Sequence, residues 1–434
     1  MARCARFAVV VWLALAVFVT IPANAAGRND LVSTHCREIE VPIDTDHSSA
    51  RLAGCGDDSA PNLLWHLDRL DQPNGEVDGQ LHGTFDRSHR GAGAVVYVMD
   101  TGIRADHVEF AGDGGSRVIA GFDVARSVPI GGSNCRSANK ATNPCYADMT
   151  ELPAAAHGTG VASLVAGQTV GVAPEAKIVS IRVMNEHGLA TTRTYADGLD
   201  TIIAHAWSNS APPFQTAIVN ISGWVLERVI PASADPIPVV TYAAVERRMR
   251  DMIYGVDARG RRDRNGKKFL FVVAGNNLDG GCGRSGYVDR FPAILGEEID
   301  GIVTVGGMTV DNEWWPGACR GSVEVLAPAQ SIFAATITGA DHYRGRKPNQ
   351  RSGTSFAAPL IAGIAARLIA DRPSMTPEQL ESAITATSSR LRHPGADFAE
   401  GKVATLQDRD QLIATSTISG SALGMPWRML ESER

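Results

Sequence analysis

Short apolar runs rich in Val and Ile alternate along this chain with segments of helical periodicity. The apolar runs are bounded by Gly, Pro, Asn or Asp and lie at residues 94–99, 177–183, 216–221, 268–273, 302–305 and 323–326. Helical patterns lie at residues 157–166, 191–207, 239–253, 355–370 and 376–387. Strands without polar alternation are buried on both faces, and helices between them allow parallel pairing. The pattern predicts an α/β fold, namely a doubly wound, mainly parallel sheet with helices on both faces.

The composition indicates a globular chain without a marked charge bias. Of its 434 residues, 44% are hydrophobic and 20% are charged, and the formal net charge is -6. This length and apolar content suffice for one large core with small appendages. We expect no nucleic-acid partner, because no overall basic excess is present. Residues 246–268 interleave Arg and Lys with Asp and Glu, which fits either an electropositive partner site or a solvated helix end and loop.

The amino terminus has the pattern of a secretory signal peptide. Arg3 and Arg6 precede an apolar run over residues 7–21, and Ala23-Asn24-Ala25 supplies an A-x-A end. These are the three parts of such a signal. The run is shorter than the ~20 residues that span a bilayer, so a membrane anchor is the less favoured interpretation. We expect residues 1–26 to be removed, no stable membrane anchor to remain, and the mature protein to be secreted or periplasmic.

Cysteine use agrees with export to an oxidising compartment. Cys4 lies in the signal, and the other six fall into neighbouring couples, namely Cys36 with Cys55, Cys135 with Cys145, and Cys282 with Cys319. An even number in an exported chain indicates disulfides, although six cysteines permit fifteen connectivities. We predict the neighbouring pairing, with residues 27–60 forming an N-terminal extension tied by a disulfide. No couple has the C-x-x-C spacing of a zinc or thiol-redox site.

Three chemically competent residues stand where apolar strands lead into helices. Asp100 ends the first apolar run, His157 opens a glycine-rich helix start, and Ser355 begins a helix after Gly353-Thr354. Parallel sheets bind ligands at the carboxyl ends of their strands. Alone, each residue has a structural explanation: a turn-bound carboxylate, a core or capping histidine, and a helix-capping serine. Together, in the order Asp-His-Ser, they match one known arrangement of the triad for nucleophilic catalysis.

A fourth polar residue ends another apolar run. Residues 271–273 lead into Ala274-Gly275-Asn276. The Asn276 amide can donate to the oxyanion that forms when the Ser355 hydroxyl attacks a carbonyl, beside the free N–H groups of the helix start. The alternative is an ordinary strand-end turn, in which Asn is common.

These segments resemble the four signature blocks of the subtilases, the subtilisin-like serine proteases. The matching blocks are Asp100-Thr101-Gly102-Ile103 with His107 and Glu109, His157-Gly158-Thr159, Ala274-Gly275-Asn276, and Gly353-Thr354-Ser355 with Pro359. Residues 65–70 and Asn277 make the proteinase K branch the most similar one. The resemblance covers residues 61–390, which we take as the catalytic domain, and leaves a C-terminal tail of unknown role at 391–434.

The resemblance implies a subtilisin-like fold and hydrolysis of peptide bonds through an acyl-enzyme intermediate. Ser355 would be the nucleophile and His157 the general base. Asp100 would orient the imidazole and stabilise its cationic form, and Asn276 would donate to the oxyanion. No cofactor is implied for catalysis.

The resemblance also implies a polypeptide substrate that lies extended against the enzyme. Its first specificity pocket would lie between Ser222-Gly223 and Ala274-Gly275. The other interpretation is a catalytically inactive subtilase-fold binding protein. A lipase is disfavoured because the G-x-S-x-G motif is absent. The oligomeric state stays open.

The chain departs from the family pattern at several positions. Gly160 stands where His is common, Phe356 where Met is common, and Leu360 where His is common. We expect these changes to alter packing rather than the proton path. Trp224 either narrows the pocket and favours small side chains or points outward. The turn at 167–171 is shorter than a widespread calcium loop, so structural calcium stays possible but unassigned, and we predict no metal ligands.

Overall fold

A computed structural model describes residues 64–70, 85, 89–125, 156–185, 188–226, 240–278, 282, 288–337, 340–341, 343 and 351–386, together with the backbone of a few short strands outside these ranges. The predicted signal peptide, the couples of Cys36 with Cys55 and of Cys135 with Cys145, and most of the tail at 391–434 lie outside the described residues.

The largest sheet has nine strands, in the order β16-β17-β13-β12-β11-β9-β3-β7-β6. They are β3 (Val95–Asp100), β6 (Val118–Asp123), β7 (Lys177–Arg182), β9 (Thr216–Ile221), β11 (Lys268–Ala274), β12 (Ile302–Met308), β13 (Val325–Pro328), β16 (Ser389–Arg390) and β17 (Lys402–Val403). Every neighbouring pair is parallel except β16 with β17. The prediction of a doubly wound, mainly parallel α/β sheet is confirmed.

Three strands of this sheet, namely β6, β16 and β17, were not predicted from the apolar pattern. β6 mixes buried with half-buried positions and includes Gly121, because it is the outermost strand on its side. β17 pairs with β13 through Leu326 and Val403, so the sheet continues past residue 390. β6 has a weak sequence signal because a strand at the sheet edge buries less apolar surface, whereas β16 and β17 are only two residues long each.

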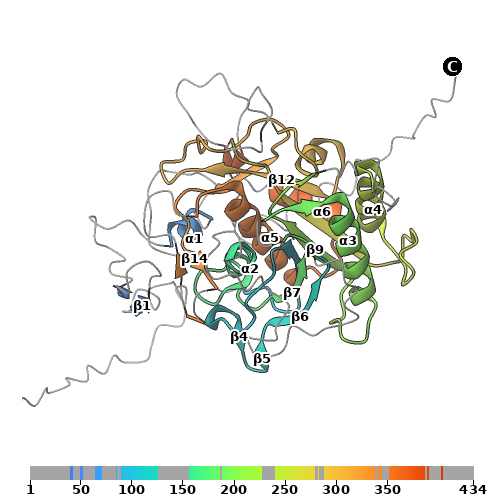
Figure 1. The fold of residues 1–434 in the computed structure, drawn as a ribbon, viewed down its shortest axis with the longest axis horizontal. Coiled ribbons are helices and arrows are strands. Elements are labelled where there is room, and N and C mark those ends of the chain that lie inside the picture. The colour runs from blue at the N-terminus through green and yellow to red at the C-terminus, as the bar shows by residue number, and fades with distance from the viewer. Residues whose placement is uncertain are drawn as a thin grey trace, which may run out of the picture.

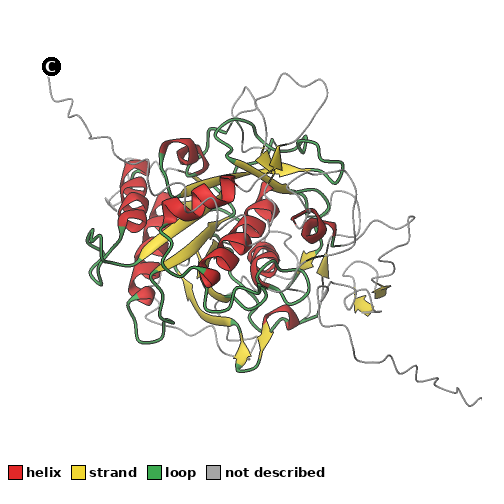
Figure 2. Cartoon of the chain, turned by 180° about the vertical axis from the view of Figure 1, so that it is seen from behind, coloured by secondary structure: helices red, strands yellow, loops and turns green. Residues whose placement is uncertain are grey.

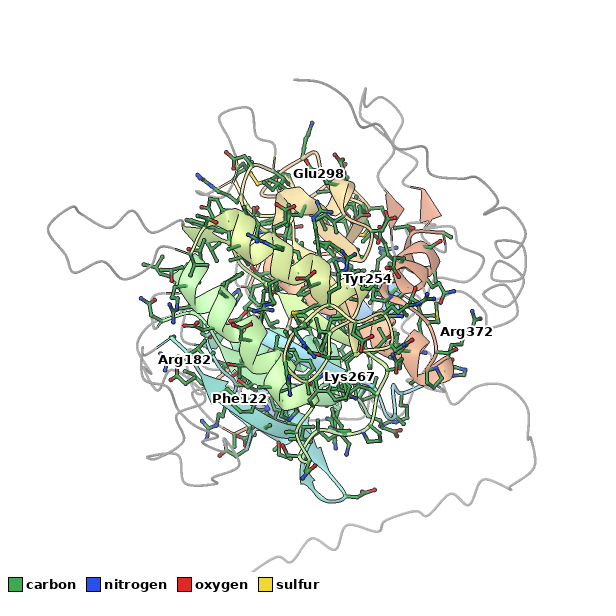
Figure 3. The ribbon with its side chains drawn as sticks, turned by 90° about the vertical axis from the view of Figure 1, so that its right-hand side faces the viewer. Phe122, Arg182, Tyr254, Lys267, Glu298 and Arg372 are labelled. Carbon is green, nitrogen blue, oxygen red and sulfur yellow. A yellow bond between two sulfur atoms is a disulfide. The ribbon has the colours of Figure 1, made fainter. Side chains whose placement is uncertain are left out.

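Helices cover both faces of the sheet. One face carries α1 (Trp65–Leu70), α2 (His157–Ala166), α5 (Thr354–Asp371) and α6 (Pro377–Ala386), and the other carries α3 (Thr192–Ala206) and α4 (Tyr242–Tyr254). Figure 1 shows α2 beside α5, and Figure 3 shows α3 and α4 together on the face turned to the viewer. Alternation along β3 explains the two cores. Val96 and Val98 pack in the first core, and Val95, Tyr97 and Met99 pack in the second.

α5 is the central helix of the first core. Among the described residues it is the helix that is long and apolar enough to span a membrane, with a mean hydropathy of 1.3, and 83% of it is buried inside the fold. It packs across β9, β11, β12 and β13 and against α2 and α6. A helix that is buried on nearly all sides needs apolar residues on every face. Figure 2 shows the helices and strands of this core from behind.

The order of the strands places the carboxyl end of β3 at a change of winding direction. From β3 the chain moves to the edge strand β6, returns to β7 beside β3, and then crosses to β9 on the other side of β3. α/β sheets bind ligands outside the carboxyl ends of their strands at such points. Asp100 is the last residue of β3.

Candidate active site

Asp100 and His157 form a hydrogen-bonded pair at this edge of the sheet. Nδ1 of His157 lies 2.9 Å from each carboxylate oxygen of Asp100. The Asp100 side chain is fully buried, and that of His157 is 24% exposed. The N–H of Thr101 donates a further hydrogen bond of 2.7 Å to Asp100. Because the carboxylate holds Nδ1, the ring nitrogen left to exchange a proton with another group is Nε2.

Backbone contacts bring the segments of Asp100 and His157 together. The N–H of Gly158 donates to the hydroxyl of Thr101 at 3.0 Å, and the N–H of Arg104 donates to the hydroxyl of Thr159 at 2.9 Å. A Cβ at position 158 would collide with the carbonyl oxygen of Gly102. Gly158 therefore allows the helix start to approach the end of β3 closely enough for the side-chain pair to form.

Ser355 lies in the first turn of α5 and is bound to the end of β9. Its Oγ donates to the carbonyl oxygen of Ser222 at 3.2 Å, and the Ser222 hydroxyl donates to the carbonyl oxygen of Ser355 at 2.9 Å. The Asn220 amide donates to the Ser222 hydroxyl at 3.0 Å. The His157 ring lies 5.5 Å, between centroids, from the ring of Phe356, the residue after Ser355. The predicted base thus lies beside Phe356, the residue that follows the predicted nucleophile.

Asn276 follows β11 and has an unusual backbone conformation. Its φ is 67°, in the left-handed region that Asn adopts more readily than most residues. Its carbonyl oxygen accepts a hydrogen bond of 3.1 Å from the N–H of Cys319. Cys319 forms a disulfide with Cys282, with a Cα–Cα distance of 5.5 Å, which confirms this predicted couple. The side chain is 4% exposed, and its Oδ1 makes no hydrogen bond within the described residues.

Asn277 is a site residue whose role the sequence did not reveal. Its Oδ1 accepts hydrogen bonds from the N–H of Thr354 at 3.0 Å and from the Thr354 hydroxyl at 3.1 Å. Thr354 is the first residue of α5. Asn277 therefore ties the start of the nucleophile's helix to the segment that carries Asn276. The repeated Asn after Ala274-Gly275 was the available signal, but it did not indicate a partner.

The two predicted walls of the specificity pocket lie side by side. β9 and β11 are parallel neighbours, with Ile221 in register with Val273, so Ser222-Gly223 and Ala274-Gly275 follow adjacent strand ends. Ser222 is 2% exposed because its hydroxyl is bound to Ser355. Gly223 is half-buried. The backbone of this edge, rather than the Ser222 side chain, is what remains for a substrate to contact.

The departure from the family pattern at Gly160 has a steric reason. A Cβ at Gly160 would overlap Nη1 of Arg351. The Arg351 guanidinium lies 5.6 Å from the centroid of the Phe356 ring, and its Nη1 donates to the carbonyl oxygen of Ala156 at 3.4 Å. Arg351 thus fills the space that a side chain at position 160 would need. Gly160 and Phe356 alter the packing beside His157, as the sequence indicated.

Two further buried groups shape the electrostatics beside Asp100. Burial, and next the Asp100 carboxylate, raise the pKa of Tyr195 well above its usual range, so this phenol stays neutral. Arg182 is the register partner of Asp100 in β7 (labelled in Figure 3). Its Nη1 lies 2.9 Å from Oδ2 of Asp123, and both side chains are buried. Asp123 thus compensates the Arg182 charge, and Asp100 stays hydrogen-bonded to His157.

The short turn after α2 does not fit a calcium ion. Oε2 of Glu109 accepts hydrogen bonds from the N–H groups of Thr169 at 2.9 Å and Val170 at 3.2 Å, and Oε1 accepts one from the Tyr343 hydroxyl at 2.5 Å. Burial, and next Glu109, raise the pKa of Tyr343 above its usual range, so the phenol stays a donor. Carboxylate oxygens are the ligands that calcium prefers, and here protein donors already bind them. Within the described residues, no group of three or more His, Cys, Asp or Glu is placed to hold a metal.

Comparison with known proteins agrees with this geometry. The sequence matches the Subtilase family over residues 91–403. It is 28% identical over 335 residues to an alkaline serine exoprotease A of Vibrio alginolyticus, covering 77% of this chain and 48% of that protein. It is 26% identical over 358 residues to a cuticle-degrading serine protease of Orbilia oligospora, covering 82% of this chain and 67% of that protein. An extracellular serine proteinase of Thermus sp. (strain Rt41A) is 28% identical over 334 residues, covering 76% of this chain and 63% of that protein.

A solved structure supports the fold independently. The crystal structure of a cold adapted subtilisin-like serine proteinase superposes with a TM-score of 0.53 at 23% identity, covering 80% of this chain and 100% of that chain. The chain spans about half the length of the Vibrio protein, 48%. The resemblance read from the motifs is confirmed. Since the family match covers most of the chain and includes Asp100, His157, Asn276 and Ser355, the chain belongs to the subtilase family.

Proposed function

We propose that this subtilase is an exported serine endopeptidase that hydrolyses internal peptide bonds with Asp100, His157 and Ser355. The observation that carries the proposal is the buried carboxylate of Asp100 at 2.9 Å from Nδ1 of His157, beside the helix that begins with Thr354-Ser355. Such a carboxylate fixes the imidazole tautomer and stabilises the imidazolium, which a base for a serine nucleophile requires.

The first half of the reaction acylates Ser355. His157 Nε2 takes the proton of Ser355 Oγ while Oγ forms a bond to the carbonyl carbon of the scissile peptide, and the carbonyl electron pair moves onto its oxygen. The C–N bond then breaks as the oxyanion collapses, and His157 returns the proton to the leaving amine. In the second half, His157 deprotonates a water that attacks the ester, and the proton returns to Ser355 Oγ as the acid leaves.

Ser355 needs one rotamer change to enter this reaction. Its hydroxyl donates to the Ser222 carbonyl, so in the proposed reaction Oγ leaves this acceptor by a turn about the Cα–Cβ bond. Rotations of this kind are fast for a side chain that is not fully enclosed. Hydrogen bonds of catalytic groups are often long or misaligned before substrate binds. The reciprocal bond from the Ser222 hydroxyl holds the Ser355 backbone in place while the side chain turns.

The developing oxyanion needs donors that are already in position. The Asn276 amide and the N–H of Ser355 are the proposed donors. Asn276 is suited to this role because its backbone is fixed through the Cys319 hydrogen bond and its side chain is buried. Loss of one such donor in a subtilisin lowers the rate by about 10²–10³-fold.

Active-site labelling of the mature, disulfide-intact protein tests the proposal. We expect a fluorophosphonate to label the wild type, and casein to be cleaved. Ser355→Ala should lose both properties while keeping its fold by circular dichroism. Ser352→Ala, a serine in the same segment whose hydroxyl accepts a hydrogen bond from the N–H of Ser331, is the matched control and should still be labelled. Cleavage of a peptide that is blocked at both ends should distinguish an endopeptidase from an exopeptidase.

A folded wild type that is neither labelled nor active would reject the proposal. That result would favour the second interpretation, a subtilase-fold binding protein. Secretion, and removal of residues 1–26, stay part of the proposal. N-terminal sequencing of the exported protein tests them, and an intact N-terminus would contradict them.

A further inference from the structure

A short segment at residues 288–291 connects the two walls of the predicted pocket. On one side, the N–H of Val288 donates to the carbonyl oxygen of Arg320 at 2.6 Å. On the other side, the carbonyl oxygen of Phe291 accepts a hydrogen bond of 3.2 Å from the N–H of Val225. Val225 begins β10 (Val225–Leu226), directly after Ser222-Gly223-Trp224.

Arg320, which binds the Val288 end of this segment, belongs to the wall that ends in Asn276. Arg320 follows Cys319, whose N–H binds the carbonyl oxygen of Asn276 and whose sulfur is bonded to Cys282. Residues 288–291 are therefore bound both to the wall that ends in Asn276 and to the wall that ends in Ser222-Gly223. Arg290 lies in the middle of this connection.

Arg290 lies against Trp224, the residue that follows the predicted pocket wall Ser222-Gly223. Its guanidinium carbon lies 5.4 Å from the centroid of the Trp224 ring. Its Nε lies 3.4 Å from Oδ1 of Asp289, the preceding residue, and the two side chains are 39% and 44% exposed. Nε itself is shielded from solvent and makes no hydrogen bond within the described part of the chain. An ion pair this open is weak, so the guanidinium keeps donors available for another acceptor.

We propose that Arg290, packed on Trp224, selects substrates that carry a Glu or Asp side chain on the acyl side of the cleaved bond. This inference rests on the proposed peptidase function and specifies its substrate class. A guanidinium recognises a carboxylate through two parallel N–H···O bonds, which a neutral side chain cannot accept equally well. The Trp224 ring holds the guanidinium in one position by cation–π contact. The sequence left two roles for Trp224, which were to narrow the pocket for small side chains or to point outward. Neither role involves the charge of Arg290.

Matched peptide substrates test the inference. The two peptides differ only in having Glu or Gln as the acyl-side residue, and kcat/KM is measured at a pH at which Glu is ionised. A hydrogen bond to a charged group contributes about 1.5–3 kcal/mol, so we expect the Glu peptide to be preferred by roughly ten- to a hundredfold. The preference should fall as salt rises, because the site is partly open to water.

Three variants separate the role of Arg290 from general effects of charge. Arg290→Gln should remove the preference, so that the Glu and Gln peptides are cleaved with kcat/KM values within about twofold of each other. Arg264→Gln makes the same charge change at an exposed position distant in sequence and should keep the preference. Asp289→Asn removes the competing carboxylate and should increase the preference. This third variant tests the inference even if Arg290→Gln does not fold.

The outcomes distinguish the inference from the proposed function. Labelling of Ser355 together with equal cleavage of the two peptides would overturn the role of Arg290 and leave the peptidase intact. A preference that survives Arg290→Gln would also overturn it. Absence of labelling and of all cleavage would overturn the peptidase and this inference together.

Discussion

At the scale of single residues, the geometry of this site depends on positions where a side chain is absent or small. Gly158 lets the start of α2 approach the end of β3, so that its N–H reaches the Thr101 hydroxyl at 3.0 Å. Its hypothetical Cβ would meet a backbone oxygen, which cannot move without moving the turn that holds Asp100. Gly160 differs from Gly158, because the atom nearest to its hypothetical Cβ is the end of the flexible Arg351 side chain and not a backbone oxygen.

Gly158→Ala should therefore harm both stability and catalysis. Overpacking against a backbone atom costs about 1–3 kcal/mol, and the displaced helix start would lengthen the contact between Asp100 and His157. We expect a lower urea midpoint and a loss of at least about tenfold in kcat, because a misplaced base slows the chemical step. Gly114→Ala is the control, since nothing lies within 4 Å of its hypothetical Cβ. Equal behaviour of the two variants would show that the close approach at Gly158 does not matter.

At the scale of elements, the start of α5 is held from outside the helix. A helix N-terminus has unsatisfied N–H groups, and here a residue from the segment after β11 satisfies one of them. Asn277 Oδ1 accepts from both the N–H and the hydroxyl of Thr354. The same contact fixes the distance between the proposed nucleophile at Ser355 and the proposed oxyanion donor at Asn276. Asn277 is thus a positioning residue for both.

Asn277→Ala should lower kcat more than a loss of stability explains. Leaving the donors of Thr354 unsatisfied costs about 1–3 kcal/mol of stability. We expect kcat to fall with little change in KM, because the helix start and the oxyanion donor lose their common anchor. Thr241→Ala is the matched control: Thr241 caps α4 by accepting from the N–H of Ala244 at 3.2 Å. This control should lose about 1 kcal/mol of stability and keep its kcat. An unchanged kcat in Asn277→Ala would contradict the positioning role.

At the scale of the whole molecule, a half-buried pair of carboxyl groups joins α6 to the sheet. Glu324 Oε2 accepts from the N–H of Thr304 at 2.9 Å, and Glu381 of α6 accepts from the N–H of Gly301. The two carboxyl groups lie next to each other, so a proton on Glu324 can bridge them. Burial, then the contact with Glu381, raises the pKa of Glu324 to about 9. The other acids around the pair are Glu297, Asp300 and Glu378.

The sign of the resulting pH dependence follows from the raised pKa. The folded protein holds this proton more tightly than the unfolded chain, so the contribution is complete below pH 4.5 and is lost as the pH rises through about 9. We expect the free energy of unfolding to fall by at least about 1 kcal/mol between pH 6 and pH 10. Glu324→Gln keeps a neutral donor toward Glu381 and should flatten this fall. Glu298→Gln, at an exposed position labelled in Figure 3, should leave the fall unchanged. The midpoint of urea unfolding is measured at pH 6 and pH 10 for the wild type and both variants. An equal fall in the midpoint for Glu324→Gln and the wild type would exclude the pair as the cause.

Much of the fold followed from local sequence, for a physical reason. A strand that is buried on both faces is continuously apolar, and a helix has a period that a short window contains, so β3, β9, β11, α2 and α5 could be predicted within a few residues. A polar residue at the end of an apolar strand, or at a helix start that follows glycine or small residues, is visible in the same window. This is why Asp100, His157, Asn276 and Ser355 could be named together, although their chemical roles are proposals that the labelling and kinetic tests decide.

What only the tertiary structure decided are the contacts between segments that are distant along the chain. No local pattern encodes that Ser222 and Ser355 exchange hydrogen bonds, that Asn277 caps α5, or that Arg290 lies over Trp224. Such contacts depend on how the sheet twists and how its helices pack, which many weak interactions set together. The sequence by itself determined the kind of fold and which residues are competent for catalysis. The packed structure determined which segments meet, and that the charge of Arg290 lies over Trp224.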